Sequence, residues 1–541
     1  MERVCMRVVF QKFKKEVFVT IAILTLIATS QLLTSIVNAE ILDYLVKMDM
    51  NGFIHETILL VAIFALYLLF TYMLIRYQVF FEQKVVTWLR DRISHAIKNT
   101  SYERFYEKNS QTYISWFTSD MEQIRTKAFT PTVEVVGGAI SAVFSAVALF
   151  MYHWSIVLLT AFCIILMAVL PALFSGELTA KTMKTSEENE HFSKHVSDLL
   201  SGYDTLFVFR KLNYLTQKIH ERSVKVGDTQ RDFSKTMAKV AVSGGISNLF
   251  CQVSVFVLTG YLAYIGEVSI GSIIATTGLS GIIFNVLGNI SQKIGSIKST
   301  APLFEKYELL ESEQNNENVD KEDSHTLIEV SDVSFNYGEK VILNHVSLGF
   351  NEGQKYAITG ESGTGKSTLL NIIAAKLTEY LGEVKFAGVD VKKQSYDELY
   401  RQMVYIAQKP HIFTTTIREN VTLTEEYTDE EVWESLEKVG LATIVRNLPQ
   451  GLDTVLGDGD SNLSGGQLQR IAFARGLIKK PKVFLLDEVS SNLDEKTTIE
   501  VLKPILEDKS VTVLWVTHHL PEALKETINQ TIQMSELNHV N

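Results

Sequence analysis

One segment of the chain carries the residue types and spacing of a phosphate-binding loop. It fits the pattern G-x-x-x-x-G-K-[ST] and consists of Gly360, Glu361, Ser362, Gly363, Thr364, Gly365, Lys366 and Ser367. Apolar residues typical of a strand (356–359) precede the loop, and a helical segment that begins at Thr368 follows it. Glycines let backbone N–H groups turn toward phosphate oxygens, and the start of the helix adds a favourable dipole. The pattern predicts a nucleoside triphosphate site, with Lys366 on the β and γ phosphates, Ser367 on Mg²⁺ and Thr368 beside them.

A second motif, acidic at its end, lies further along the chain. Residues 483–488 form an apolar run that finishes in Asp487 and Glu488. An apolar run of this length suits a strand buried on both faces of a parallel sheet, and ligands bind at the C-terminal ends of such strands. We expect Asp487 to hold Mg²⁺ and Glu488 to orient and deprotonate an attacking water. Taken alone, the run would fit a strand and a solvated acidic turn equally well.

A third motif lies between the first two and carries a family resemblance. It consists of Leu463, Ser464, Gly465, Gly466 and Gln467, and Gln469 and Arg470 follow. By itself the motif could be a glycine turn at the start of a helix. In the company of the other two motifs it resembles the ATP-binding cassette (ABC) transporters, specifically an exporter-type half-transporter with a membrane domain fused to a nucleotide-binding domain.

The resemblance implies roles for further residues. Tyr337 resembles the aromatic residue that stacks on adenine, although an ordinary strand aromatic is the alternative. Gln408 resembles the glutamine that touches Mg²⁺ and water. His518 resembles the histidine that contacts the γ phosphate, with His519 as the competing candidate. The implied catalytic group is therefore Glu488, His518, Lys366 and Gln408, and the implied metal ligands are Ser367, Gln408 and Asp487.

In the family, the motif at Ser464, Gly465, Gly466 and Gln467 completes the ATP site of the other subunit. One phosphate-binding loop and one such motif in a single chain therefore imply a dimer. Asymmetric pairs usually have one subunit without the catalytic glutamate and another with a damaged motif. This chain keeps both Glu488 and the intact motif, which favours a homodimer. A heterodimer with two working sites is the alternative.

The first 310 residues predict a membrane domain. Of 541 residues, 46% are hydrophobic, and the mean hydropathy of +0.11 is high for a soluble protein of this size. A bilayer core of about 30 Å needs roughly 20 apolar residues in a helix. Six segments qualify, at residues 17–37, 57–77, 133–152, 154–174, 240–265 and 270–290. We therefore expect an α-helical six-span transmembrane domain followed by an α/β P-loop ATPase domain, in the ABC exporter architecture.

The loops between the spans predict the orientation. Lys and Arg are frequent before the first span and in residues 78–131, whereas residues 38–56 hold only Lys47. Both termini are therefore expected in the cytoplasm, in a multi-pass protein of the cell membrane. The polar segments 78–131 and 176–237 contain almost no Gly or Pro, which predicts long cytoplasmic helical extensions of the spans.

Charge and composition divide the chain into domains. Residues 1–310 carry a net charge of +4, and the remainder carries −15, which argues against nucleic acid as a partner. The predicted division is a transmembrane domain at 1–310, a charged linker at 311–327 and a nucleotide-binding domain at 328–541. By the resemblance, coupling helices lie near 110–121 and 202–215. Three cysteines at unrelated spacing exclude a disulfide framework or a zinc site.

The resemblance implies ATP hydrolysis coupled to transport, with ATP and Mg²⁺ bound and a peptide, lipid or hydrophobic small molecule exported. An importer on the exporter fold, of the siderophore or haem type, and a membrane-bound ATP-gated regulator are the alternatives. Polar residues in the spans could line a cavity, although hydrogen bonds between helices are the simpler interpretation. They include Gln31, Ser35, Asn38, Asn248, Gln252, Asn285 and Asn289. Arg76 and Glu134 lie near the ends of spans and could equally snorkel or contact cargo.

Overall fold

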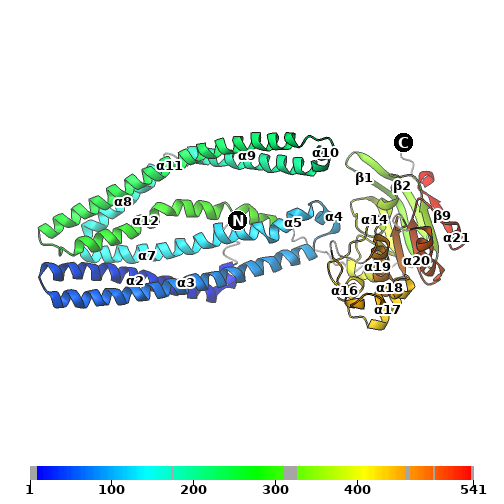
Figure 1. The fold of residues 1–541 in the computed structure, drawn as a ribbon, viewed down its shortest axis with the longest axis horizontal. Coiled ribbons are helices and arrows are strands. Elements are labelled where there is room, and N and C mark those ends of the chain that lie inside the picture. The colour runs from blue at the N-terminus through cyan, green and yellow to red at the C-terminus, as the bar shows by residue number, and fades with distance from the viewer. Residues whose placement is uncertain (1–8, 173–174, 309–325, 458–462, 491–493, 538–541) are drawn as a thin grey trace. The chain divides into compact units, whose positions relative to one another are not determined.

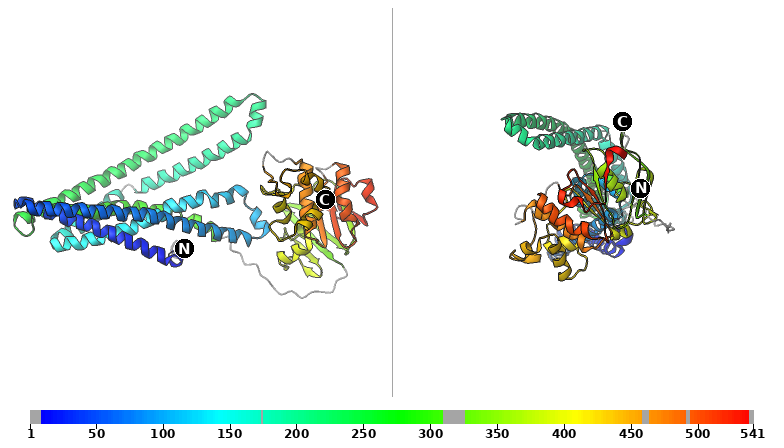
Figure 2. Two further views of the ribbon diagram at one scale, coloured as in Figure 1. Left: turned by 60° about the horizontal axis from the view of Figure 1, so that its bottom comes forward. Right: turned by 90° about the vertical axis from the view of Figure 1, so that its right-hand side faces the viewer.

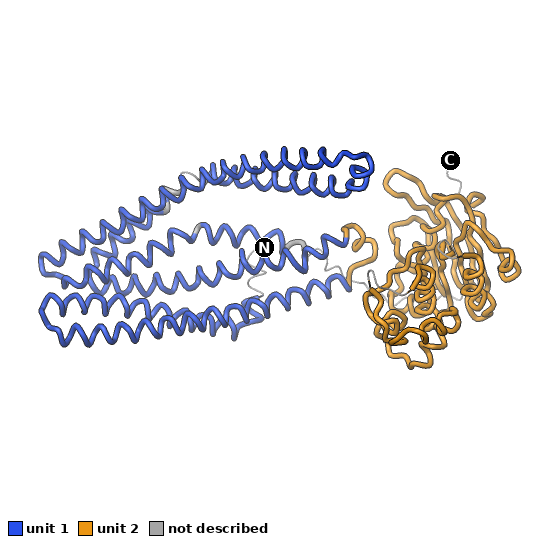
Figure 3. Tube along the Cα trace, in the orientation of Figure 1, with its two compact units in different colours: residues 1–98, 110–311 blue, residues 99–109, 312–541 orange. Residues whose placement is uncertain are grey.

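The chain forms two compact units. The computed structural model describes residues 9–172, 175–308, 326–457, 463–490 and 494–537. The first unit comprises residues 1–98 and 110–311, and the second comprises residues 99–109 and 312–541 (Figure 3). Most of the predicted linker, up to residue 325, lies outside the described residues. A short stretch of the N-terminal half, residues 99–109, therefore packs with the C-terminal unit.

In the described part of the first unit, every regular element is a helix. Its elements are α2 (Lys14–Val46), α3 (Met50–Lys98), α5 (Ser110–Phe117), α6 (Ser119–Gln123), the π-helix η1 (Ile124–Phe129), α7 (Thr130–Tyr152), α8 (Trp154–Ala172), α9 (Ser175–Ser201), α10 (Tyr203–Val208), α11 (Leu212–Tyr264), α12 (Ser272–Lys298) and α13 (Ala301–Glu308). Among the described residues, five helical stretches are long and apolar enough to cross a membrane, and Trp154–Met167 is a shorter apolar helix. Within the described residues, the six predicted spans coincide largely with α2, α3, α7, α8, α11 and α12, and residues 173–174 of the fourth span lie outside them.

Several helices continue far beyond the length of a span. α3 has 49 residues and α11 has 53 residues. At about 1.5 Å per residue, α11 is roughly 80 Å long, more than twice the thickness of a hydrocarbon core. Figures 1 and 2 show α9 running beside α11 and α2 beside α3. The polar stretches before and after the apolar segments are therefore helical extensions, as their lack of Gly and Pro predicts.

Close helix contacts hold the centre of this unit together. α7 packs against both α2 and α12. A Cβ atom on Gly137 would lie 2.7 Å from a methyl group of Leu24, and one on Gly138 would lie 2.9 Å from a methyl group of Val286. A larger residue at either position would require Leu24 or Val286 to shift, so the two glycines help α7 to lie close to α2 and α12.

The second unit contains two sheets. One is a four-stranded sheet in the order β2-β1-β4-β5, with antiparallel pairing, and the other is a five-stranded parallel sheet in the order β6-β7-β8-β3-β9. The strands are β1 (Ile328–Tyr337), β2 (Lys340–Phe350), β3 (Lys355–Thr359), β4 (Leu381–Phe386), β5 (Val389–Asp390), β6 (Met403–Ile406), β7 (Val483–Asp487), β8 (Thr512–Val516) and β9 (Gln530–Gln533).

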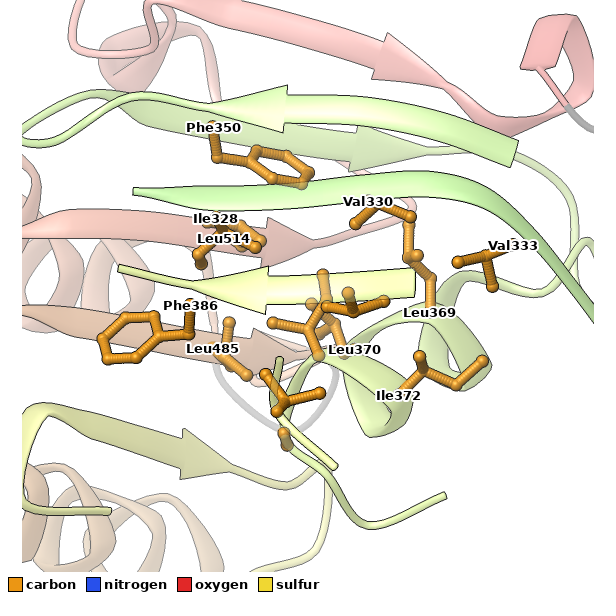
Figure 4. Packing of buried hydrophobic residues seen from close by; sticks show 14 of the residues in the cluster. Ile328, Val330, Val333, Phe350, Leu369, Leu370, Ile372, Phe386, Leu485 and Leu514 are labelled. Atoms are coloured by element: carbon orange, nitrogen blue, oxygen red, sulfur yellow. The ribbon is translucent and has the colours of Figure 1, made fainter. Parts of the chain in front are cut away.

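Helices surround and connect these strands. They are α4 (Tyr102–Tyr106), α14 (Lys366–Ile373), α15 (Tyr396–Gln402), α16 (Ile417–Thr422), α17 (Asp429–Lys438), α18 (Ala442–Arg446), the 3₁₀ helix η2 (Gly451–Asp453), α19 (Gly465–Ile478), α20 (Glu495–Glu507), α21 (Glu522–Lys525) and α22 (Met534–Leu537). One buried cluster joins the two sheets to α14, with Phe350 and Phe386 from the first sheet, Leu485 and Leu514 from the second, and Leu369 from the helix (Figure 4). This core fixes the helix that follows the phosphate-binding loop.

Candidate ATP site

The phosphate-binding loop joins β3 to the start of α14. Gly365 precedes the helix with φ of +92°, and a Cβ atom there would lie 2.7 Å from Leu343. Only glycine therefore fits the turn. The Lys366 Nζ atom donates hydrogen bonds to the backbone oxygens of Gly360 (2.9 Å) and Glu361 (2.7 Å). Burial lowers the pKa of Lys366, while Glu488 and Asp487 oppose that shift. The ammonium group is thus held inside the loop that the sequence predicts for phosphates.

Asp487 and Ser367 meet although 120 residues separate them in the chain. The Ser367 hydroxyl donates to Asp487 Oδ1 at 2.7 Å, and the Tyr405 hydroxyl donates to Asp487 Oδ2 at 2.8 Å. Asp487 is the last residue of β7, and all five residues of this strand are buried. The hydroxyl and the carboxylate together offer the hard oxygen donors that Mg²⁺ prefers, so the residues present fit this ion.

Glu488 lies directly after the buried strand, in an unusual conformation. Its φ is +49°, in the left-handed region that residues with a Cβ atom rarely adopt. The carboxylate accepts a hydrogen bond from Gln408 Nε2 at 2.9 Å and lies 3.0 Å from His518 Nε2. Strain of this kind costs about 1–3 kcal/mol and is concentrated at functional sites. The three predicted residues therefore form one hydrogen-bonded group at the end of β7.

A cavity opens beside this group. It has a volume of about 190 Å³, and Glu488, Ser490, His518 and Pro521 contribute to its lining. The side chain of Glu488 is 22% exposed and that of His518 is 47% exposed, so both can reach a ligand. A carboxylate that borders such a space has the geometry needed to accept a proton from a water molecule.

The glycine-containing motif forms the start of α19. The Ser464 hydroxyl accepts from the backbone N–H of Gln467, and the Gln467 side chain accepts from the backbone N–H of Ser464, which makes a capping box. Ser464 and Gly465 are exposed. Among the described residues, no hydrogen bond joins this motif to the phosphate-binding loop. Its exposed helix start is suited to an anion that comes from outside this unit.

Two other predicted site residues, Thr368 and Tyr337, lie at different places relative to the phosphate-binding loop. Thr368 is buried in the first turn of α14, next to Ser367. Tyr337 is 54% exposed at the end of β1, with its ring edge-on to Phe335 at 4.8 Å between centroids. Its side chain is free to stack on a planar ligand, and its contact with adenine stays a prediction.

The sequence motifs do not mark three residues that make contacts in or near this unit's site and its supporting loops. Tyr405 fixes the second oxygen of Asp487, and Lys376 Nζ lies 3.2 Å from the centroid of the Tyr405 ring. Burial lowers the pKa of Lys376 to about 8. Glu103, on α4, accepts hydrogen bonds from the backbone N–H and the hydroxyl of Thr378. The position of Tyr405 three residues before Gln408 is a signal that could have indicated the first, whereas the other contacts follow from the tertiary structure alone.

The fold and site thus define a membrane-embedded helical domain joined to an ATPase of the P-loop class. Residues 343–491 match the family described as "ABC transporter", and residues 17–287 match the family described as "ABC transporter transmembrane region". The second match covers just over half of the chain, and the chain belongs to the ABC transporter family. It is an integral multi-pass membrane protein with an ATP-binding ATPase domain coupled to transport, and it has the half-transporter organisation of ABC exporters.

Individual relatives are similar at low identity. The "ATP-dependent lipid A-core flippase" of Desulfotalea psychrophila is 29% identical, over 81% of this chain and 77% of that protein. The "Lactococcin-A transport/processing ATP-binding protein LcnC" of Lactococcus lactis is 27% identical, over 68% of this chain and 52% of that protein. The solved "Structure of a bacterial Atm1-family ABC exporter with ATP bound" superposes with a TM-score of 0.77 at 18% identity, covering 93% of this chain and 91% of that one.

Proposed function

We propose that this protein is an ATP-driven exporter that works as a homodimer by alternating access. Its cargo is a peptide, a lipid or a hydrophobic small molecule, which are the classes that the sequence analysis predicts. The relatives named for lipid A-core and lactococcin A support a lipid or a peptide as cargo, and the exporter architecture of the fold supports an outward direction. The loop charges support a place in the cell membrane with both termini in the cytoplasm.

ATP binding is assigned to groups that the fold holds in place. Backbone N–H groups of the loop from Gly360 to Gly365 and the N-terminus of α14 bind the phosphates, and Tyr337 stacks on the adenine ring. Lys366 exchanges its two carbonyl partners for phosphate oxygens. Ser367, Asp487 and Gln408 would hold Mg²⁺, which would supply positive charge to the triphosphate when bound.

Hydrolysis is assigned to the group around Glu488. A water molecule in the adjoining cavity gives a proton to the Glu488 carboxylate as its oxygen attacks the γ phosphorus. The bond between that phosphorus and the β–γ bridging oxygen breaks, and ADP and inorganic phosphate leave. His518, 3.0 Å from Glu488, orients the carboxylate and donates to a γ-phosphate oxygen. Gln408 Nε2 donates a hydrogen bond to the other carboxylate oxygen and so helps to orient it.

The second copy of the chain supplies the remaining part of each ATP site. The exposed start of α19, at Ser464 and Gly465, covers the γ phosphate bound by the other copy, and its N–H groups and dipole stabilise the negative charge. Closure on two ATP molecules favours one orientation of the membrane helices, and release of phosphate restores the other.

The observation that carries this proposal is the exposed capping box of α19, which has no hydrogen bond to the phosphate-binding loop among the described residues. A mixing experiment tests it. Glu488→Gln and Ser464→Arg are each expected to abolish ATP hydrolysis when present in both copies. A mixed dimer contains one intact site, formed by Glu488 from one copy and Ser464 from the other. Random mixing should therefore recover at most about one quarter of the wild-type rate.

The matched control is Glu500→Gln, at an exposed position on α20, which should hydrolyse ATP at the wild-type rate. A site completed within one chain predicts no recovery on mixing, and that result would refute the proposed dimer. Normal turnover by Glu488→Gln would refute the assignment of the base. Inside-out vesicles test the direction, because an exporter accumulates cargo in them when ATP is added and an importer does not.

A further inference from the structure

The helical unit contains a cavity whose lining combines charge, amide groups and aliphatic side chains. It has a volume of about 480 Å³ and lies among α2, α3, α7 and α12. These helices run alongside one another in Figure 1, and α2 and α7 each contact α12. The cavity belongs to this unit alone and shares no residue with the ATP site.

Two charged side chains form an ion pair in the wall of this cavity. Lys293 Nζ on α12 lies 3.0 Å from Glu134 Oε2 on α7. The two side chains are 31% and 49% exposed, so both can be reached by a ligand. Among the cavity's described lining residues they are the only ionised groups. The lining therefore has no net charge but offers one cationic and one anionic group on adjacent helices.

Four carboxamide side chains line the same space, namely Gln31, Gln78, Asn285 and Asn289. In each of these carboxamides, either the oxygen or the nitrogen already makes a hydrogen bond to a protein group. Gln31 Oε1 accepts from Ser141 at 3.1 Å, Gln78 Nε2 donates to Glu82 at 2.8 Å, and Asn289 Nδ2 donates to Asn285 Oδ1 at 2.9 Å.

The remaining amide nitrogen or oxygen of each carboxamide is available to a ligand. Among the described residues, no hydrogen bond uses the Gln31 or Asn285 amide nitrogen or the Gln78 or Asn289 side-chain oxygen. Two donors and two acceptors are thus available, which is the complement of a peptide backbone with one N–H and one C=O per residue. Leu, Ile and Val side chains complete the wall and suit an apolar side chain.

We propose that this cavity binds a short amphipathic peptide segment that carries one basic and one acidic group, with its backbone on the carboxamides. The inference rests on the proposed function and names the class of cargo. The acidic group of the peptide pairs with Lys293, and the basic group pairs with Glu134. A ligand with only one sign of charge would leave one of the two protein groups desolvated and unpaired, which is costly.

This argument favours a peptide over an anionic lipid headgroup. Recognition of a phosphate commonly uses several cationic groups or a helix N-terminus. Here the one lysine among the described lining residues is already paired with a carboxylate. An anionic headgroup on Lys293 would lie beside the Glu134 carboxylate and bring no cation for it, so the two anions would repel each other, whereas the basic group of the peptide neutralises Glu134.

Binding can be measured on the full-length protein in nanodiscs without nucleotide. The probes are three short peptides with one neutral fluorophore and the same apolar side chains, which carry one Lys and one Glu, two Lys, or two Glu. A fluorescent anionic phospholipid is the fourth probe. Fluorescence anisotropy is expected to show that the wild-type protein binds the Lys/Glu peptide about tenfold more tightly than either other peptide.

Variants of the ion pair test whether the cavity sets this preference. Lys293→Met should move the preference to the two-Lys peptide, and Glu134→Gln should move it to the two-Glu peptide. The exchange Glu134→Lys with Lys293→Glu keeps the pair and should keep the preference for the Lys/Glu peptide. Lys239→Met is the matched control, because Lys239 pairs with Glu177 at 3.5 Å outside this cavity and its loss should leave the preference unchanged.

The outcomes separate this inference from the proposed function. If no peptide is preferred, or if the lipid binds in a manner that Lys293→Met abolishes, the cavity does not select a peptide. If the preference is present but does not respond to either single substitution or to the exchange, the ion pair is not the determinant. Either result overturns the inference and leaves the mixing experiment on Glu488 and Ser464 intact.

Discussion

The contact between Glu103 and Thr378 joins α4 to the rest of the second unit, and its loss should be measurable. Glu103 Oε1 accepts from the backbone N–H of Thr378 at 2.9 Å, and Oε2 accepts from its hydroxyl at 2.6 Å. A hydrogen bond to a charged group contributes about 1.5–3 kcal/mol. Glu103 is half-buried, so water partly replaces these bonds when they are lost. We therefore expect Glu103→Ala to lower the free energy of local opening at Thr378 by about 2 kcal/mol in total.

Hydrogen exchange at the Thr378 amide reports this energy directly. A loss of about 2 kcal/mol corresponds to exchange about 30-fold faster, because the amide exchanges through local opening. Mass spectrometry of the peptide that contains Thr378 measures the rate. The Lys376 amide, which donates to Asn371 O at 2.8 Å, is an internal control that should not change.

Two further variants test the electrostatic part of this reasoning. Glu103→Gln keeps a hydrogen-bond acceptor without the charge and should give a smaller acceleration, since neutral bonds have about half the strength. Glu107→Ala removes an exposed carboxylate that makes no side-chain hydrogen bond among the described residues, and it should leave exchange unchanged. Unchanged exchange at Thr378 in Glu103→Ala, or equal acceleration in Glu107→Ala, would show that the carboxylate does not hold this contact.

Three other expectations follow from the site and its supports. Tyr405→Phe removes the donor 2.8 Å from Asp487 and should weaken Mg²⁺-dependent ATP binding about tenfold by calorimetry, with Tyr396→Phe as the control. Burial lowers the pKa of Lys376 from 10.5 to about 8, so the folded state binds the proton less tightly than the unfolded state. Thermal stability should therefore rise with pH between about 8 and 10.5, and Lys376→Met should remove this component of the rise. Arg125→Ala leaves the Glu82 carboxylate, whose side chain is 3% exposed, without its cation and should lower the free energy of unfolding by about 2 kcal/mol, whereas an unchanged melting temperature would contradict this.

The local parts of the ATP site were predictable because short-range geometry defines them. The order strand, glycine loop and helix follows from the residues between 356 and 368, and the structure has β3, the loop and α14 there. A run of four buried apolar residues followed by Asp487 likewise forms β7. The membrane helices were predictable for a similar reason, because each span is a continuous apolar stretch that must satisfy its backbone hydrogen bonds internally.

The sequence by itself determined the class of this protein. The apolar spans, the phosphate-binding loop, the acidic strand end and the motif at Ser464 are all continuous stretches of the chain and can be recognised without the fold. Only the tertiary structure decided which distant side chains meet. Glu103 and Thr378 are 275 residues apart, and neither belongs to a recognisable motif. Lys293 and Glu134 become partners because α7 and α12 pack together, and Tyr405 reaches Asp487 because β6 pairs with β7. Hydropathy and spacing describe what lies within a few turns of a residue, whereas these contacts depend on how whole helices and strands pack.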